Sequence, residues 1–255
     1  MTEAEVKRRV GNPFRDRGFQ VTEIPETTTE TPDLLLEKNE QRFLLEIKTK
    51  EDDPVELAEF HDTLQRGGVA ETALPFAPQN TISGVVRKGA SQLAAFADPT
   101  DPFRLLWLLA IGTDAKGQYE QFRSTLYGLT NVVGPDAVPL MPCYFLKHSA
   151  FFRWRASLDG AIIATTRGAE LLLNPLSGRC AALAQSEVAQ MFQPHVVDPL
   201  ELERLGHAYV ADCEIDRNNE NEVLGYVSGK YGRPMLMAMN LGSLTAYIEI
   251  PEQQP

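Results

Sequence analysis

Residues 32–50 (PDLLLEKNEQRFLLEIKTK) constrain the fold most, because charged side chains stand at the ends of two otherwise apolar runs. Leu34 to Leu36 and Phe43 to Lys48 predict two short strands, joined by a polar turn about Asn39. An unpaired ion is expensive to bury, so a functional role is one explanation for charges at the end of such a hairpin.

Three side chains are predicted to converge at that end. Glu46 and Lys48 are two apart on a strand and therefore share a face, and pairing about Asn39 brings Asp33 opposite Glu46 to Lys48. Two carboxylates and the Ile47 carbonyl offer oxygens suited to Mg²⁺ or Mn²⁺. Lys48 beside such an ion can orient or deprotonate a water and offset phosphate charge. The alternative is a solvated hairpin whose charges form weak surface ion pairs.

The pattern Pro32-Asp33, a gap of about a dozen residues and then Glu46-Ile47-Lys48 resembles the signature of the PD-(D/E)xK nuclease superfamily. That superfamily includes restriction endonucleases, Holliday-junction resolvases and helicase-associated exonucleases. The resemblance implies an α/β fold with a restriction-endonuclease-like αβββαβ core, a mixed sheet flanked by helices. It also implies Asp33 and Glu46 as metal ligands and Lys48 as the catalytic lysine. The pattern is short, and the resemblance covers only residues 3–111.

A helical pattern over residues 80–96 adds three candidate site residues. Lys88 and Gln92 are four apart and share a face. Gln92-Leu-Ala-Ala-Phe96 resembles a Gln-x-x-x-aromatic motif of the exonuclease branch, with phenylalanine in place of the usual tyrosine. The resemblance implies that Gln92 supports the catalytic lysine or the phosphate, and Arg87 and Lys88 are expected phosphate contacts. The alternative is an amphipathic helix with a polar outer face.

The remaining chain is predicted to surround this hairpin with helices and strands. Glu5 is expected to cap the first helix together with Thr2, or, as the resemblance implies, to be a fourth member of the site beside Asp33, Glu46 and Lys48. Residues 103–111 predict a strand covered on both faces and parallel to the Glu46 strand. Residues 69–79 and 212–222 predict loops, and residues 226–241 a weakly alternating strand. We expect a nuclease-like core over residues 1–135, and a mixed α/β extension over residues 136–255 that is separate or packed into the same domain.

The net charge of −11 opposes nonspecific binding to nucleic acid, because lysine and arginine contacts with phosphate supply most of that affinity. A local basic groove can exist on an acidic body, and a partner protein or a second copy of the chain is expected to help hold the substrate. The one basic–aromatic cluster, residues 148–155 (HSAFFRWR), is interpreted as a surface for bases and phosphates or as core aromatics with arginine caps.

Other features of the sequence bear on the setting of the protein. Its longest apolar run is too short to span a bilayer, and no secretory signal is recognisable. Three widely separated cysteines make a zinc site or a disulfide framework unexpected. We therefore expect a cytoplasmic protein without a membrane partner.

The sequence thus predicts a Mg²⁺- or Mn²⁺-dependent nuclease acting on DNA, with RNA as the less favoured substrate, in defence against foreign DNA or in repair. The alternative is a catalytically inactive binding or assembly subunit of the same fold, which the acidity and Phe96 favour.

Overall fold

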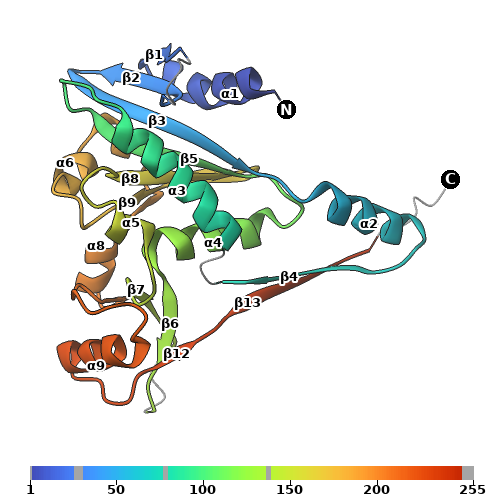
Figure 1. Cartoon of the computed structure of the whole chain (residues 1–255), viewed down its shortest axis with the longest axis vertical. Coiled ribbons are helices and arrows are strands. Elements are labelled where there is room, and N and C mark those ends of the chain that lie inside the picture. Colours follow the sequence, from blue (N-terminus) through green and yellow to red (C-terminus); the bar gives the residue numbers. More distant parts are fainter. Residues whose placement is uncertain (1, 26–30, 77–79, 136–138, 249–255) are drawn as a thin grey trace.

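The computed structural model describes residues 2–25, 31–76, 80–135 and 139–248. Its central element is a mixed sheet in the order β1-β2-β3-β5-β8-β9-β10 (Figure 1). The strands of this sheet are β1 (Gln20–Glu23), β2 (Leu34–Lys38), β3 (Gln41–Lys50), β5 (Phe103–Ala110), β8 (Gly160–Thr165), β9 (Gly168–Leu173) and β10 (Val196–Val197). The first three form an antiparallel meander, whereas β3, β5 and β8 run parallel. The fold is therefore α/β, with a mixed sheet flanked by helices.

The predicted hairpin about Asn39 is confirmed. Asn39 and Glu40 both have positive φ angles, of 48° and 64°, as a two-residue turn of the twist-compatible type requires. Leu34 pairs with Leu45 across the two strands, so the chain just before β2 lies beside the middle of β3.

Helices cover both faces of the sheet, and alternate strand residues enter two separate cores. Leu45 and Leu105 point to one face and Leu44 and Leu106 to the other. The first face is covered by α1 (Glu3–Arg15), α6 (Cys180–Ala184) and α7 (Glu187–Phe192). The second is covered by α3 (Asn80–Ala95), α4 (Ala115–Tyr127) and α5 (Ala150–Arg153). The prediction that residues 103–111 form a strand buried on both faces and parallel to the Glu46 strand is confirmed.

The chain reaches β5 through the succession α1-β1-β2-β3, then α3, then β5 beside β3. Helix α2 (Pro54–Gln65) and strand β4 (Ala70–Pro75) are inserted between β3 and α3. Strands β8 to β10, which follow the predicted boundary at residue 135, continue the same sheet. Residues on both sides of that boundary therefore share one sheet and its cores.

Two further sheets lie outside the central one. A small sheet has the order β11-β7-β6-β12 and lies near the last helices. Its strands are β6 (Thr130–Val133), β7 (Met141–Tyr144), β11 (Tyr209–Val210) and β12 (Met237–Met239). The helices beside it are α8 (Pro199–Arg204) and α9 (Glu220–Tyr231). The third is an arm that projects from the body, in which β4 pairs antiparallel with β13 (Gly242–Tyr247) beside α2 (Figure 1).

The predicted loop over residues 69–79 is wrong in its described part, where β4 pairs with β13; residues 77–79 lie outside the described residues. The partner strand lies far away in the sequence, so local composition does not show the pairing.

The loop and strand predicted over residues 212–222 and 226–241 are also wrong in part, because α9 spans their junction. This helix buries Val223, Leu224 and Val227 at helical spacing and ends at Gly232 in the left-handed conformation. Its two internal glycines weaken the helical signal in the sequence.

None of the helices in the described part of the chain is long and apolar enough to cross a membrane.

Candidate active site

The structure brings Asp33, Glu46 and Lys48 together at the open end of the hairpin. The Ile47 N–H donates to Asp33 Oδ2 at 2.7 Å, which ties the residue before β2 to the middle of β3. Lys48 Nζ donates to Glu46 Oε1, as their shared strand face predicts. The Glu46 side chain is 2% exposed and that of Lys48 is 19% exposed. The convergence predicted from the sequence is therefore present.

A fourth charged residue, Lys7, was not anticipated from the sequence. It projects from α1, and its Nζ lies 3.0 Å from Asp33 Oδ1 and 2.6 Å from Glu3 Oε1. Burial alone would lower the pKa of Lys7, but its ion pairs with Glu3 and Asp33 outweigh burial and raise it. The sequence signal was slight: Lys7 follows Val6 on the inner side of α1, four residues after Glu3.

Glu5, the other residue of α1 considered for this site, has a different role. It is exposed, its carboxylate accepts a hydrogen bond from the Thr2 N–H at 2.9 Å, and its own N–H donates to Thr2 Oγ1 at 3.3 Å. This reciprocal pair is the predicted capping box. The capping prediction is confirmed, and the structure places Lys7, not Glu5, against Asp33.

The electrostatics of the site centre on Glu46. Burial, together with the negative charge of nearby Asp33, raises the pKa of this carboxyl to about 7 against the opposing effect of the Lys48 ammonium. Glu46 Oε2 is buried and has no hydrogen-bond partner among the described residues. A buried acceptor without a partner is unfavourable in a folded protein, so this oxygen is suited to bind a proton or a cation.

The donor set fits a hard divalent cation. Two neighbouring carboxylates, one with a buried partnerless oxygen, supply the negative charge that Mg²⁺ or Mn²⁺ prefers. Ile47 donates its N–H toward Asp33, and in a strand the carbonyl of a residue points to the same side as its N–H. Asp33, Glu46 and Ile47 would thus hold the ion. Within the described ranges, no group of three or more His, Cys, Asp or Glu residues could hold a metal ion, so this candidate site has two carboxylate ligands and no third.

Helix α3 packs against the strand that carries this site, and Gly89 lies at the contact. A Cβ atom on Gly89 would lie 2.6 Å from Leu106 Cδ2, 3.3 Å from Glu46 Cγ and 3.4 Å from Lys48 Cγ. Gln92, one turn later, is 9% exposed, and its Oε1 is buried without a hydrogen-bond partner in the described part of the chain. The structure therefore places Gln92 on the predicted helix near β3, but no hydrogen bond joins it to Lys48 there.

The contact at Gly89 leads to a stability prediction with opposite signs at two glycines of one helix. In a helix, alanine ordinarily replaces glycine with a gain of up to about 1 kcal/mol. We expect this for Gly84→Ala, because a Cβ there meets no atom within 4 Å. Gly89→Ala should instead lower the free energy of unfolding by about 1–3 kcal/mol, because the buried Leu106 must move. Urea denaturation of both variants checks this, and equal gains would contradict the close packing.

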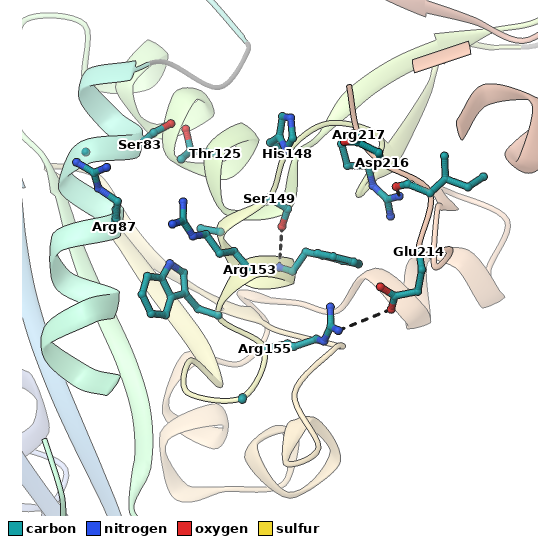
Figure 2. A pocket seen from close by; sticks show the side chains of 16 residues that line it. Ser83, Arg87, Thr125, His148, Ser149, Arg153, Arg155, Glu214, Asp216 and Arg217 are labelled. Carbon is teal, nitrogen blue, oxygen red and sulfur yellow. Dashed lines mark hydrogen bonds and ion pairs between the residues drawn. The ribbon is translucent and has the colours of Figure 1, made fainter. Parts of the chain in front are cut away.

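Arg87 and Lys88, the predicted phosphate contacts, are both exposed on α3. Arg87 lines a cleft of about 950 Å³ formed with α4, α5 and residues 214–217, and Figure 2 shows this cleft. Its lining includes none of Asp33, Glu46 and Lys48.

The basic–aromatic cluster of residues 148–155 forms one wall of this cleft. Phe151 is fully buried in the core, Phe152 and Trp154 are half-buried, and Arg153 and Arg155 are exposed. The cluster is therefore part core and part surface, so each of the two interpretations describes some of its residues.

Comparison of the sequence with profiles of known protein families and with curated proteins gave no match.

Proposed function

We propose that this chain is a Mg²⁺- or Mn²⁺-dependent nuclease that hydrolyses phosphodiester bonds in DNA, with a restriction-endonuclease-like core of the PD-(D/E)xK type. The observation that carries the proposal is the convergence of Asp33, Glu46 and Lys48 at one end of a hairpin, with Glu46 buried and one of its oxygens partnerless. The succession α1-β1-β2-β3-α3-β5, with β5 parallel to β3, supports the same core.

The residues have separate roles in this proposal. Asp33 is fixed by the Ile47 N–H and by Lys7, and Glu46 is fixed by Lys48, so both carboxylates are held before substrate arrives. A bound divalent cation would supply Lewis-acid chemistry and a more acidic water. Lys48 positions the attacking water and offsets the negative charge that develops on the phosphate. Gln92 offers its partnerless Oε1 to orient the lysine or a water.

The proposed substrate is DNA, and RNA is the less favoured one. Cleavage of foreign DNA and repair are both compatible with the chemistry of the site. Because the chain carries a net charge of −11, the proposal includes a protein partner or a second copy that helps to hold the strand.

Replacing Lys48 tests the proposal directly. We expect Lys48→Ala to reduce Mn²⁺-dependent cleavage of single- and double-stranded DNA by at least ~100-fold, the usual size of a lost acid–base or positioning group. Lys50→Ala is the matched control, because Lys50 lies two residues later on the same face of β3 and the charge change is equal. Gel assays of plasmid and oligonucleotide substrates measure the effect. Equal cleavage by Lys48→Ala and the wild-type protein would reject the assignment.

A second candidate function, an inactive subunit of the same fold, is favoured by one observation. Each carboxylate already has a protein cation beside it, Lys7 for Asp33 and Lys48 for Glu46, so the site is partly neutralised without a metal. Calorimetry with Mn²⁺ separates the two. A site abolished by Asp33→Asn supports the nuclease, whereas no heat of binding in the wild-type protein supports the inactive subunit.

A further inference from the structure

We propose that the cleft between α3 and α5 binds a segment of single-stranded nucleic acid, with Arg87 and Arg153 on its phosphates and Trp154 against a base. The choice of nucleic acid as the ligand rests on the proposed function. The cleft itself is a separate feature, because it shares no lining residue with the Asp33, Glu46 and Lys48 site.

The cleft carries two arginines that no carboxylate of the described residues neutralises. The net charge is −11, and seven arginines of the described residues pair with a carboxylate, among them Arg42, Arg66, Arg104, Arg179 and Arg204. Arg87 and Arg153 are exposed and form no ion pair within the described ranges. Figure 2 shows Arg87 on α3 and Arg153 on α5, both among the side chains that line the cleft. Two guanidinium groups without carboxylate partners are a ready phosphate site.

Carboxylates on the opposite wall are already engaged. Glu214 lies 3.8 Å from Arg155, an ion pair drawn in Figure 2. Asp216 accepts hydrogen bonds from Asn218, at 3.0 Å from its N–H and 3.1 Å from its side-chain nitrogen. Neither acid neutralises Arg87 or Arg153, so the positive side of the cleft remains available to an anion.

An aromatic surface adjoins these cations. Trp154 lines the cleft and is half-buried, and the Arg153 guanidinium lies 5.7 Å from the centre of its ring. Base–aromatic stacking beside basic residues is the usual means by which proteins hold single strands without reading sequence. A duplex keeps its bases stacked inside, so the combination favours an unpaired strand over a duplex.

The walls of the cleft are held in place by buried contacts. Ser149 caps α5, accepting from the Phe152 N–H at 3.1 Å while its hydroxyl donates to the Leu126 carbonyl at 2.6 Å. On the other wall, the buried Arg217 donates to the Ala211 and Cys213 carbonyls and lies 5.0 Å over the Phe152 ring. A preformed cleft loses little conformational entropy when a ligand binds.

Tryptophan fluorescence offers a direct readout, because the chain has two tryptophans and Trp107 is buried at 6% exposed. Titration of the full chain with oligothymidylate of about 12 nucleotides, in EDTA to prevent cleavage, should quench Trp154. Trp154→Phe should remove the quenching. Arg87→Ala combined with Arg153→Ala should weaken binding at least ~10-fold. The slope of the logarithm of the binding constant against the logarithm of the salt concentration should become about 1.4 less steep.

The control is Arg66→Ala combined with Arg204→Ala, which changes the net charge equally at side chains that are 77% and 69% exposed and line no part of the cleft. It should bind oligothymidylate like the wild-type protein. Absence of quenching, equal weakening by both double variants, or equally tight binding of thymidine 5′-monophosphate would overturn the proposal. The titration is carried out in EDTA and cleavage is assayed with Mn²⁺, so loss of binding at this cleft and loss of cleavage are measured separately.

Discussion

At a pH near 8, Glu46→Gln is expected to unfold at a higher urea concentration than the wild-type protein, although it loses metal-dependent cleavage. Burial raises the pKa of Glu46 from an ordinary 4.5 to about 7, so its ionised form is disfavoured in the folded protein. Glutamine keeps the shape and can still accept the Lys48 hydrogen bond, but it cannot ionise.

The sign of the effect follows from proton binding. Between pH 4.5 and about 7 the folded protein holds more protons than the unfolded chain, so its stability falls as pH rises through that window. The loss is complete above the folded pKa and amounts to about 3 kcal/mol for Glu46. In the wild type, the ionised Glu46 still attracts the Lys48 ammonium, and Glu46→Gln loses that attraction. The free energy of unfolding of Glu46→Gln near pH 8 is therefore expected to exceed that of the wild type by about 1–3 kcal/mol.

Urea denaturation in EDTA, repeated across this pH range, measures the effect. The stabilities of the two proteins should converge near pH 4, where Glu46 is neutral in both states. Added Mn²⁺ should stabilise the wild type and leave Glu46→Gln unchanged, since only a ligand bound by the folded state shifts unfolding. Parallel pH profiles for the two proteins would show that Glu46 carries no unfavourable charge. A stabilising substitution that removes activity is typical of a functional site.

The largest loss of stability is expected at Asp159, which lies at the start of β8 and is 2% exposed. Its carboxylate accepts from the Arg104 N–H at 2.8 Å and from Ser177 Oγ at 2.6 Å, and it pairs with Arg179. Arg179 also donates to the Asp101 carbonyl at 2.7 Å. Asp159 thus joins the starts of two central strands to a loop and a cation.

Asp159→Ala should lower the free energy of unfolding by about 3–5 kcal/mol, because it leaves a cation and two donors without their buried acceptor. Asp62→Ala is the matched control, since Asp62 forms an exposed pair with Arg66 and should change stability by less than ~0.5 kcal/mol. Thermal and urea unfolding measure both variants. A loss at Asp159 as small as that at Asp62 would mean that the network contributes little.

Local patterns in the sequence predicted the elements near the candidate site. The hairpin turn at Asn39, the shared face of Glu46 and Lys48, and the capping box of Thr2 and Glu5 each depend on residues a few positions apart. Periodicity and spacing report such contacts because backbone geometry fixes them.

Contacts between distant segments were not predictable in the same way. Lys7 reaches Asp33 only because α1 folds back against the meander, and Arg87 lines the same cleft as Arg153 only because α3 and α5 cover the same face. Two arginines more than sixty positions apart carry no mutual signal in a single sequence. The sequence shows which chemical groups each segment carries, whereas the packing of the layers decides which segments come together.

The pairing of β4 with β13 has a consequence for how the molecule is assembled. Ala70 pairs with Tyr247, so β4 is synthesised long before its partner strand. Until β13 is made, the edge of β4 that pairs with it remains unpaired. Strands so far apart in sequence pair late and slowly, because the entropy of closing a long loop is lost before their hydrogen bonds form. The meander of β1, β2 and β3 joins neighbours and can form early. The projecting arm should therefore be the last part of the protein to fold, and the first to remain unfolded if synthesis ends early.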